Sequence, residues 1–130
     1  MTQSDVKSSQ TILNVAAIFD LVYGVLFLLV PRWLFALSHD PGAPGNPGWV
    51  RWSGGLLIGV AVTGFLAAAK PETQRPFVFG LTIASVLIAL ALLYSLFAEG
   101  YAGAQWFLWV PIAINACLAV ALAWVLSKLG

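Results

Sequence analysis

The chain has 130 residues, of which 61% are hydrophobic and 8% are charged, and its mean hydropathy is +0.93. A soluble domain carries about 25% charged residues to keep its surface hydrated, so lipid must cover most of this surface. The net charge of +1 leaves no basic patch, and we expect no nucleic acid as a partner. One cysteine, Cys117, and one histidine, His39, allow neither an intrachain disulfide nor a zinc site, and we expect no metal.

Four apolar stretches follow one another along the chain. Each approaches the roughly 20 residues that a helix needs to cross a bilayer. The polar or helix-breaking segments PRWLFALSHDPGAPGNPG, KPETQRP and AEGYAGA separate them. The predicted spans are residues 12–30, 50–69, 77–97 and 105–127. We therefore expect an all-α protein, a transmembrane four-helix bundle, in which a polar N-terminal tail (residues 1–11) precedes a single membrane domain (residues 12–130).

The basic residues and the tryptophans predict how the bundle is oriented. The side with both termini carries four basic residues: Lys7, Lys70, Arg75 and Lys128. The opposite side carries only Arg32 and Arg51, so the positive-inside rule places both termini in the cytoplasm. Five tryptophans share the outer side and predict an aromatic belt there together with Arg51: Trp33, Trp49, Trp52, Trp106 and Trp109. We expect an integral protein of the bacterial plasma (inner) membrane.

Small residues at regular helical spacing predict the packing faces, because close backbone contact holds helices together in lipid. In the second span, Gly55 and Gly59 begin a ridge with steps of four residues. Gly80 begins a shorter ridge in the third span, and Ala119 lies on a ridge of the fourth. In the first span, three small residues surround the acidic Asp20: Ala16, Ala17 and Gly24. The few polar groups should therefore turn inward.

Asp20 is the strongest single signal of chemistry. It lies well inside the first span, where an ionised carboxylate costs about 2.5–3.5 kcal/mol on insertion scales and needs a partner or a proton. Four further polar residues would complete an intramembrane binding pocket: Tyr23, Thr63, Ser85 and Asn115. Two interpretations stay open, because Asp20 either serves function or hydrogen-bonds a residue such as Asn115 and locks the bundle.

No pattern in the chain indicates catalysis. Ser53 has no histidine at a fixed spacing, and the acids Asp40, Glu72 and Glu99 fall in three separate loops, so neither a nucleophile–base set nor paired carboxylates are expected. We expect no enzyme activity, no catalytic residues and no cofactor. A membrane enzyme that acts on lipid or quinone, with Asp20 as general acid or base, is a third hypothesis.

Short motifs connect the chain to a known group. They are the proline that closes the first span (VPRWLF, 30–35), the entry into the second span (VRWSGGLLIGV, 50–60) and the turn AAAKPETQRP (67–76). With the long outer loop, these resemble the DoxX-like group of small bacterial four-helix membrane proteins over residues 12–127. The resemblance implies a membrane accessory or binding subunit. Together with the small-residue ridges and the absence of catalytic sets, it leads us to expect a non-catalytic protein that contacts membrane lipid and assembles with itself or with a membrane protein partner.

A second resemblance supports the alternative function. Small multidrug transporters also have four short helices and one membrane-embedded acid in the first, which Asp20 matches in position. Their acid is a glutamate and their loops are shorter than the segment 31–48. This likeness implies a proton-coupled small-molecule transporter that uses Asp20.

Overall fold

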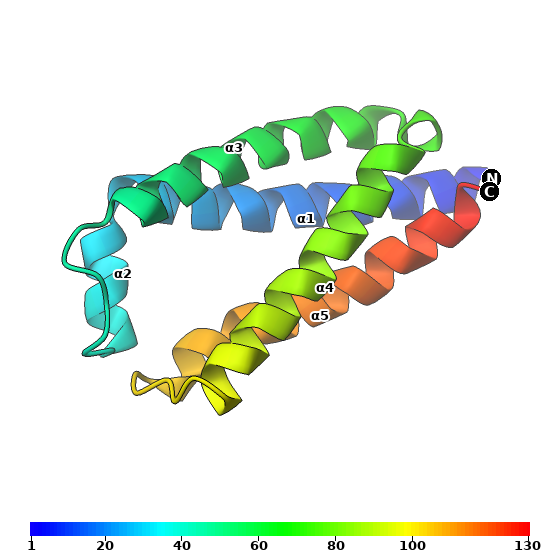
Figure 1. Ribbon diagram of the computed structural model, residues 1–130. Coiled ribbons are helices and arrows are strands. Elements are labelled where there is room, and N and C mark those ends of the chain that lie inside the picture. The colour runs from blue at the N-terminus through cyan, green and yellow to red at the C-terminus, as the bar shows by residue number, and fades with distance from the viewer.

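The protein is all-helical in a computed structural model that describes residues 1–130 (Figure 1). Its four long helices are α1 (Gln3–Leu29), α3 (Gly48–Ala69), α4 (Arg75–Phe97) and α5 (Gln105–Lys128). Two short elements connect them, the helix α2 (Pro31–Ser38) and the 3-10 turn η1 (Pro71–Thr73). All four long helices are long and apolar enough to cross a membrane, so the predicted four-span fold is confirmed.

The first helix starts well before the apolar stretch that predicted it. Thr2 caps α1, because its Oγ1 accepts a hydrogen bond from the Asp5 backbone N–H at 3.1 Å. The Asp5 carboxylate in turn accepts from the Thr2 N–H at 3.4 Å. This reciprocal capping box satisfies two backbone donors at the helix start. Most of the polar segment 1–11 is therefore the first turns of α1 rather than a separate tail.

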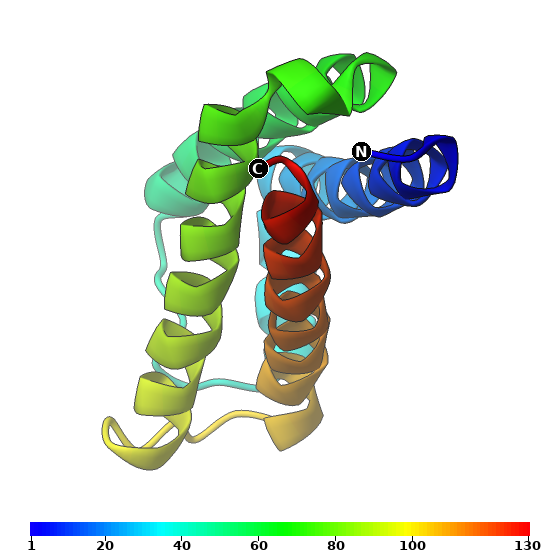
Figure 2. The same cartoon turned by 90° about the vertical axis from the view of Figure 1, so that its right-hand side faces the viewer.

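The bundle consists of two antiparallel helix pairs. Helix α1 packs along α3, and α4 packs along α5. The pairs meet where α1 contacts α5, toward the end that holds both termini, and they diverge toward the other end (Figures 1 and 2). Helix α2 lies at the diverging end and runs from the end of α1 toward the α4–α5 loop (Figure 1). The four-helix bundle is thus closed at one end and open at the other.

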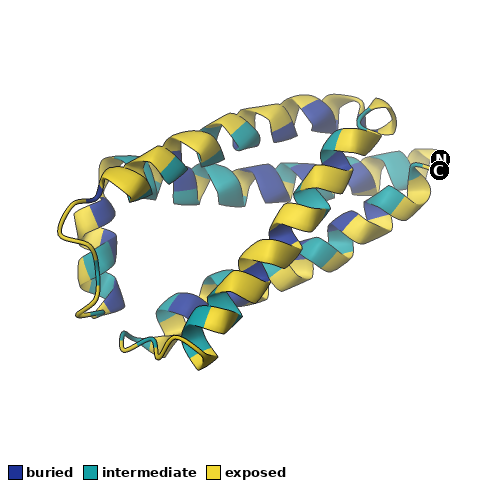
Figure 3. Cartoon of the chain, viewed as in Figure 1, coloured by how far each residue is buried: buried dark blue, intermediate teal, exposed yellow.

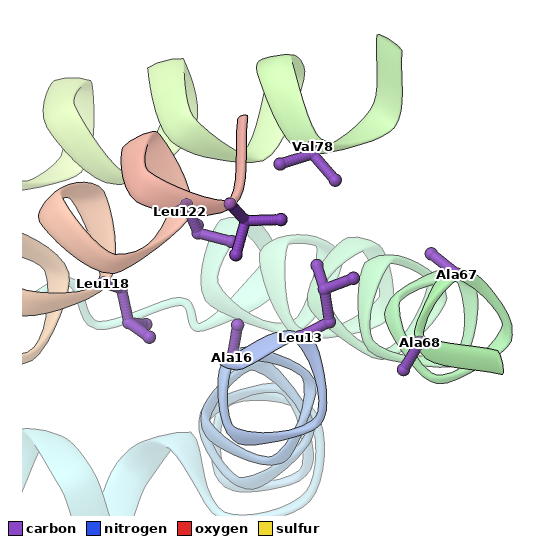
Figure 4. Close-up of a cluster of buried hydrophobic side chains, with 8 residues drawn as sticks. Leu13, Ala16, Ala67, Ala68, Val78, Leu118 and Leu122 are labelled. Carbon is purple, nitrogen blue, oxygen red and sulfur yellow. The ribbon is translucent and has the colours of Figure 1, made fainter. Parts of the chain in front are cut away.

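The hydrophobic core lies at the closed end, and all four long helices contribute to it (Figure 4). Its eight residues are Leu13, Ala16, Ala67, Ala68, Val78, Leu118, Leu122 and Val125. Four of them, including Leu13 and Leu122, have no exposed surface. Elsewhere the buried residues form narrow stripes, and much of the outward helix surface is exposed and apolar, as a lipid-covered surface would be (Figure 3).

Glycines bring the backbones of α1 and α3 into close contact. A Cβ atom on Gly54 would lie 2.6 Å from the Leu28 backbone nitrogen and 2.7 Å from the Gly24 carbonyl oxygen. A Cβ on Gly64 would lie 3.0 Å from the Ala17 Cβ. Larger side chains would force the two helices apart, so this interface depends on small residues.

The predicted packing ridges on α3 and α4 are wrong. Gly55, Gly59 and Gly80 are exposed, and a Cβ on any of them would meet no atom within 4 Å. Successive helix residues are rotated by about 100°, so the contact at Gly54 leaves its neighbour Gly55 on another face. Ala119 is half-buried on α5.

Candidate functional site

Asp20 lies between two contacts of α1. Ala16, one turn earlier, belongs to the core at the closed end, and Gly24, one turn later, contacts α3. Both neighbours are buried, as is Ala17, which confirms that Asp20 shares the small-residue face of its helix. Its own side chain is half-buried, and no charge or hydrogen-bond donor of the chain acts on it. The carboxyl group therefore sits on the inner face of the bundle without a protein partner.

The four other residues of the expected pocket are not joined to Asp20. Thr63 is exposed, and its hydroxyl donates to the Gly59 carbonyl at 2.9 Å. The Asn115 amide donates to the Pro111 carbonyl of its own helix at 2.8 Å. Side chains of this kind often bond back one turn within a helix, which satisfies them without a partner helix. The hydrogen bond from Asn115 to Asp20 that would lock α1 to α5 is not formed.

Tyr23 and Ser85 also form no hydrogen bond with Asp20. The Tyr23 ring meets Phe27 of the same helix edge to face, with centroids 5.8 Å apart. Ser85 is buried on α4. The structure thus places the five predicted residues on four helices without a hydrogen bond between any two of them, and Asp20 carries the only carboxyl group among them.

The five tryptophans of the predicted aromatic belt lie at one end of the bundle. All five are exposed and lie on α2 and on the first turns of α3 and α5: Trp33, Trp49, Trp52, Trp106 and Trp109. These elements begin at the end of the bundle away from the termini (Figure 1). Exposed indole rings at one end of membrane-spanning helices are typical of the headgroup level.

Arg51 has a structural contact that its sequence position did not predict. Its Nη1 donates to the Leu28 carbonyl at 2.5 Å, in the last turn of α1. The last carbonyls of a helix have no intrahelical donor, and a cation there also complements the helix dipole. Arg51 therefore caps α1 from α3 and strengthens the pair at the end away from the termini.

A backbone carbonyl connects the two helix pairs at the open end. The Ser38 carbonyl, at the end of α2, accepts from the Ala104 N–H at 2.6 Å and from the Tyr101 hydroxyl at 3.4 Å. Burial and the nearby Asp40 carboxylate raise the pKa of the Tyr101 hydroxyl above its ordinary value. Tyr101 therefore keeps its proton, and with it this hydrogen bond, up to a higher pH than a free tyrosine would.

Two acidic residues that the sequence places in separate loops line one recess at the open end of the bundle. Asp40 and Glu99 line a polar recess of about 350 Å³ together with Ser95 and Tyr101. Ser95 Oγ donates to Glu99 at 3.2 Å, and the Gly42 N–H donates to Asp40 at 2.9 Å. Residues expected in separate loops thus line the same recess, because α2 carries Asp40 toward the α4–α5 loop.

Comparison with known protein families gave no match, and neither did comparison with curated proteins or with solved structures. The residues and geometry of this chain therefore carry the functional argument by themselves.

Proposed function

We propose that the protein is a non-catalytic accessory or binding subunit of the bacterial plasma membrane, which assembles with itself or with another membrane protein. The proposal agrees with the resemblance to the DoxX-like group. It takes its main support from the outward surfaces of α3 and α4.

The observation that carries the proposal is a set of small residues without a partner in the chain. Gly55, Gly59 and Gly80 are exposed, with open space where a side chain would be. Glycine exposes backbone and lacks side-chain contacts, so it gains little against lipid, whereas it allows a second helix to approach closely. A helix from a second copy or from a partner protein would bury these three glycines, as α1 buries Gly54 within the α1/α3 pair.

Purification from membranes in a mild detergent tests this proposal. We expect the native chain to elute as an oligomer or with a partner, and we expect Gly59→Leu to release it. Ala123→Leu is the matched control, because Ala123 is a small exposed residue on α5, away from these surfaces. A native protein that elutes only as a single copy would contradict the proposal, as would a complex unaffected by Gly59→Leu.

A second candidate function is proton-coupled transport through Asp20. The observation that favours it is the half-buried carboxyl group on the inner face of α1, which no protein group engages. Ionisable residues inside a bundle are rare and mark proton or substrate pathways. Under this proposal, Asp20 would exchange a proton for a cationic substrate.

Uptake into proteoliposomes under a proton gradient tests this second function. Asp20→Asn should abolish uptake of a lipophilic cation, whereas Asp20→Glu should retain part of it, because a carboxyl group remains. Equal uptake by the native protein and Asp20→Asn would contradict a role for the carboxyl group.

A further inference from the structure

An apolar groove runs between α1 and α5 and plays no part in the functions proposed above. It has a volume of about 430 Å³, within the roughly 300–1,000 Å³ of ordinary ligand pockets. Eight of its nine lining residues are hydrophobic, and the ninth is Thr11. Val15, Ala113 and Cys117 are exposed along it, so the groove is open on its side. In a membrane, hydrocarbon faces this opening.

The groove has the length of one lipid leaflet. It extends from Thr11 to Phe19 on α1 and from Ala121 to Ala113 on the antiparallel α5. Eight residues of helix rise about 12 Å, and one leaflet contributes about 15 Å of hydrocarbon, half of the bilayer core. The groove occupies the middle part of both helices, and Thr11 and Ala121 mark the groove end nearer to the termini, so an acyl chain would enter it from that side.

Positive charge lies where a lipid headgroup would be. Lys128 follows Ala121 by seven residues, about two turns, and therefore lies on the groove face of α5 about 10 Å further out. Its Nζ lies 5.6 Å from the centre of the Trp124 ring, which holds the ammonium group near the helix surface. Lys7 precedes Thr11 by one turn on α1, and the Thr11 hydroxyl donates to its carbonyl at 3.1 Å.

We propose that this groove binds one acyl chain of an anionic glycerophospholipid, with the headgroup phosphate at Lys128 and Lys7. The apolar lining selects hydrocarbon, and the two lysines select a negatively charged headgroup over a zwitterionic one. Trp124 lies at the boundary between the two parts of the lipid. This site is independent of the assembly through α3 and α4.

Native mass spectrometry of the detergent-solubilised full-length chain tests the site. With phosphatidylglycerol we expect one tightly held lipid, and with phosphatidylcholine of the same chains much weaker binding. Lys128→Gln should weaken phosphatidylglycerol binding about fivefold, the effect of one lysine near an anionic surface. Ala113→Phe should remove the bound lipid, because the ring fills the groove, whereas Ala116→Phe places the same ring on an exposed position outside it. Equal binding by these two variants, or by both lipids, would overturn the proposal.

The single cysteine gives a second readout that does not depend on groove-filling variants. Cys117 lines the groove, so phosphatidylglycerol should slow its alkylation by N-ethylmaleimide, and phosphatidylcholine should do so much less. In the double variant Ala116→Cys/Cys117→Ala the thiol lies outside the groove, and its alkylation should not respond to lipid. Equal slowing in both proteins would overturn the proposal. Protection that follows protein concentration rather than lipid would also overturn it, because a second copy would then cover the groove.

Discussion

The two helix pairs are built in different ways. In α1/α3, glycines let backbone meet backbone, and a Cβ on Gly54 would collide with Leu28 and Gly24. In α4/α5, the one glycine of the helices, Gly80, faces open space, and larger side chains such as Leu108 and Ile112 are buried instead. An added methyl group at Gly54 would therefore force α1 and α3 apart, whereas one at Gly80 would meet no other atom of the chain. The two pairs are held to each other by the shared core at the closed end and by the hydrogen bonds to the Ser38 carbonyl at the open end.

Loss of the shared core should have the largest effect. Leu122 has no exposed surface and lies in the cluster where the pairs meet. We expect Leu122→Ala to lower the free energy of unfolding by about 2–5 kcal/mol, because it leaves a cavity at the junction. Thermal unfolding in detergent, followed by circular dichroism, measures the change. Leu87→Ala is the control, since Leu87 on α4 is 58% exposed. Equal destabilisation by the two variants would show that the junction does not hold the pairs.

An added side chain at Gly54 should break α1/α3 specifically. Gly54→Val forces atoms against the backbone of α1, and overpacking of this kind costs about 1–3 kcal/mol. The same unfolding measurement on Gly55→Val and Gly80→Val should show little change in a detergent that dissociates any assembly, because within the single chain both positions face open space. If Gly55→Val is as destabilising as Gly54→Val, the contact face assigned to α3 is incorrect.

Removal of the Arg51 cap should weaken the α1/α3 pair at the end away from the termini. Arg51→Met loses the hydrogen bond to the Leu28 carbonyl, and we expect a loss of about 1 kcal/mol. Arg32→Met removes an arginine for which no hydrogen bond is seen, and should leave the unfolding temperature unchanged. Hydrogen exchange at the last turn of α1 locates the effect. An unchanged exchange rate there in Arg51→Met would argue against the cap.

The smallest effect concerns the contact at Ser38. Because the Asp40 carboxylate raises the pKa of Tyr101, Asp40→Asn should lower that pKa toward the ordinary value of 10.0. A pKa that is raised in the folded state contributes stability below the ordinary pKa, and this contribution is lost as the pH rises through the folded value. Absorbance titration in a Tyr23→Phe/Tyr94→Phe background measures the shift. An unchanged pKa would mean that Asp40 does not act on Tyr101.

Much of the fold could be predicted because hydrophobicity and length alone mark the spans. The inward face of α1 around Asp20 could also be predicted, since Ala16, Ala17 and Gly24 leave one small-residue face. On α3 the choice was ambiguous, because Gly54 and Gly55 are adjacent and only the partner helix decides between them.

The long-range contacts could not be predicted. Arg51 donates to a backbone carbonyl 23 residues away, and Ser38 accepts through its backbone carbonyl. Any residue type could supply these carbonyls, so the sequence indicates neither contact. The same holds for Asp40 and Glu99, which line one recess only because α2 lies at the open end.

Because the two helix pairs diverge, Asp20 lies between the α1 contact with the core and the α1 contact with α3. The Ser38 carbonyl connects the two pairs at the open end. Distances between paired spin labels in a lipid bilayer test this divergence directly. Labels at Thr11→Cys and the native Cys117 line one groove and should lie close together. Leu29 ends α1 and Trp106 lies in the first turn of α5, so labels at Leu29→Cys and Trp106→Cys, in a Cys117→Ala background, sit at the open end and should lie clearly farther apart. Equal separations at the two ends would contradict the divergence and indicate a uniformly closed bundle.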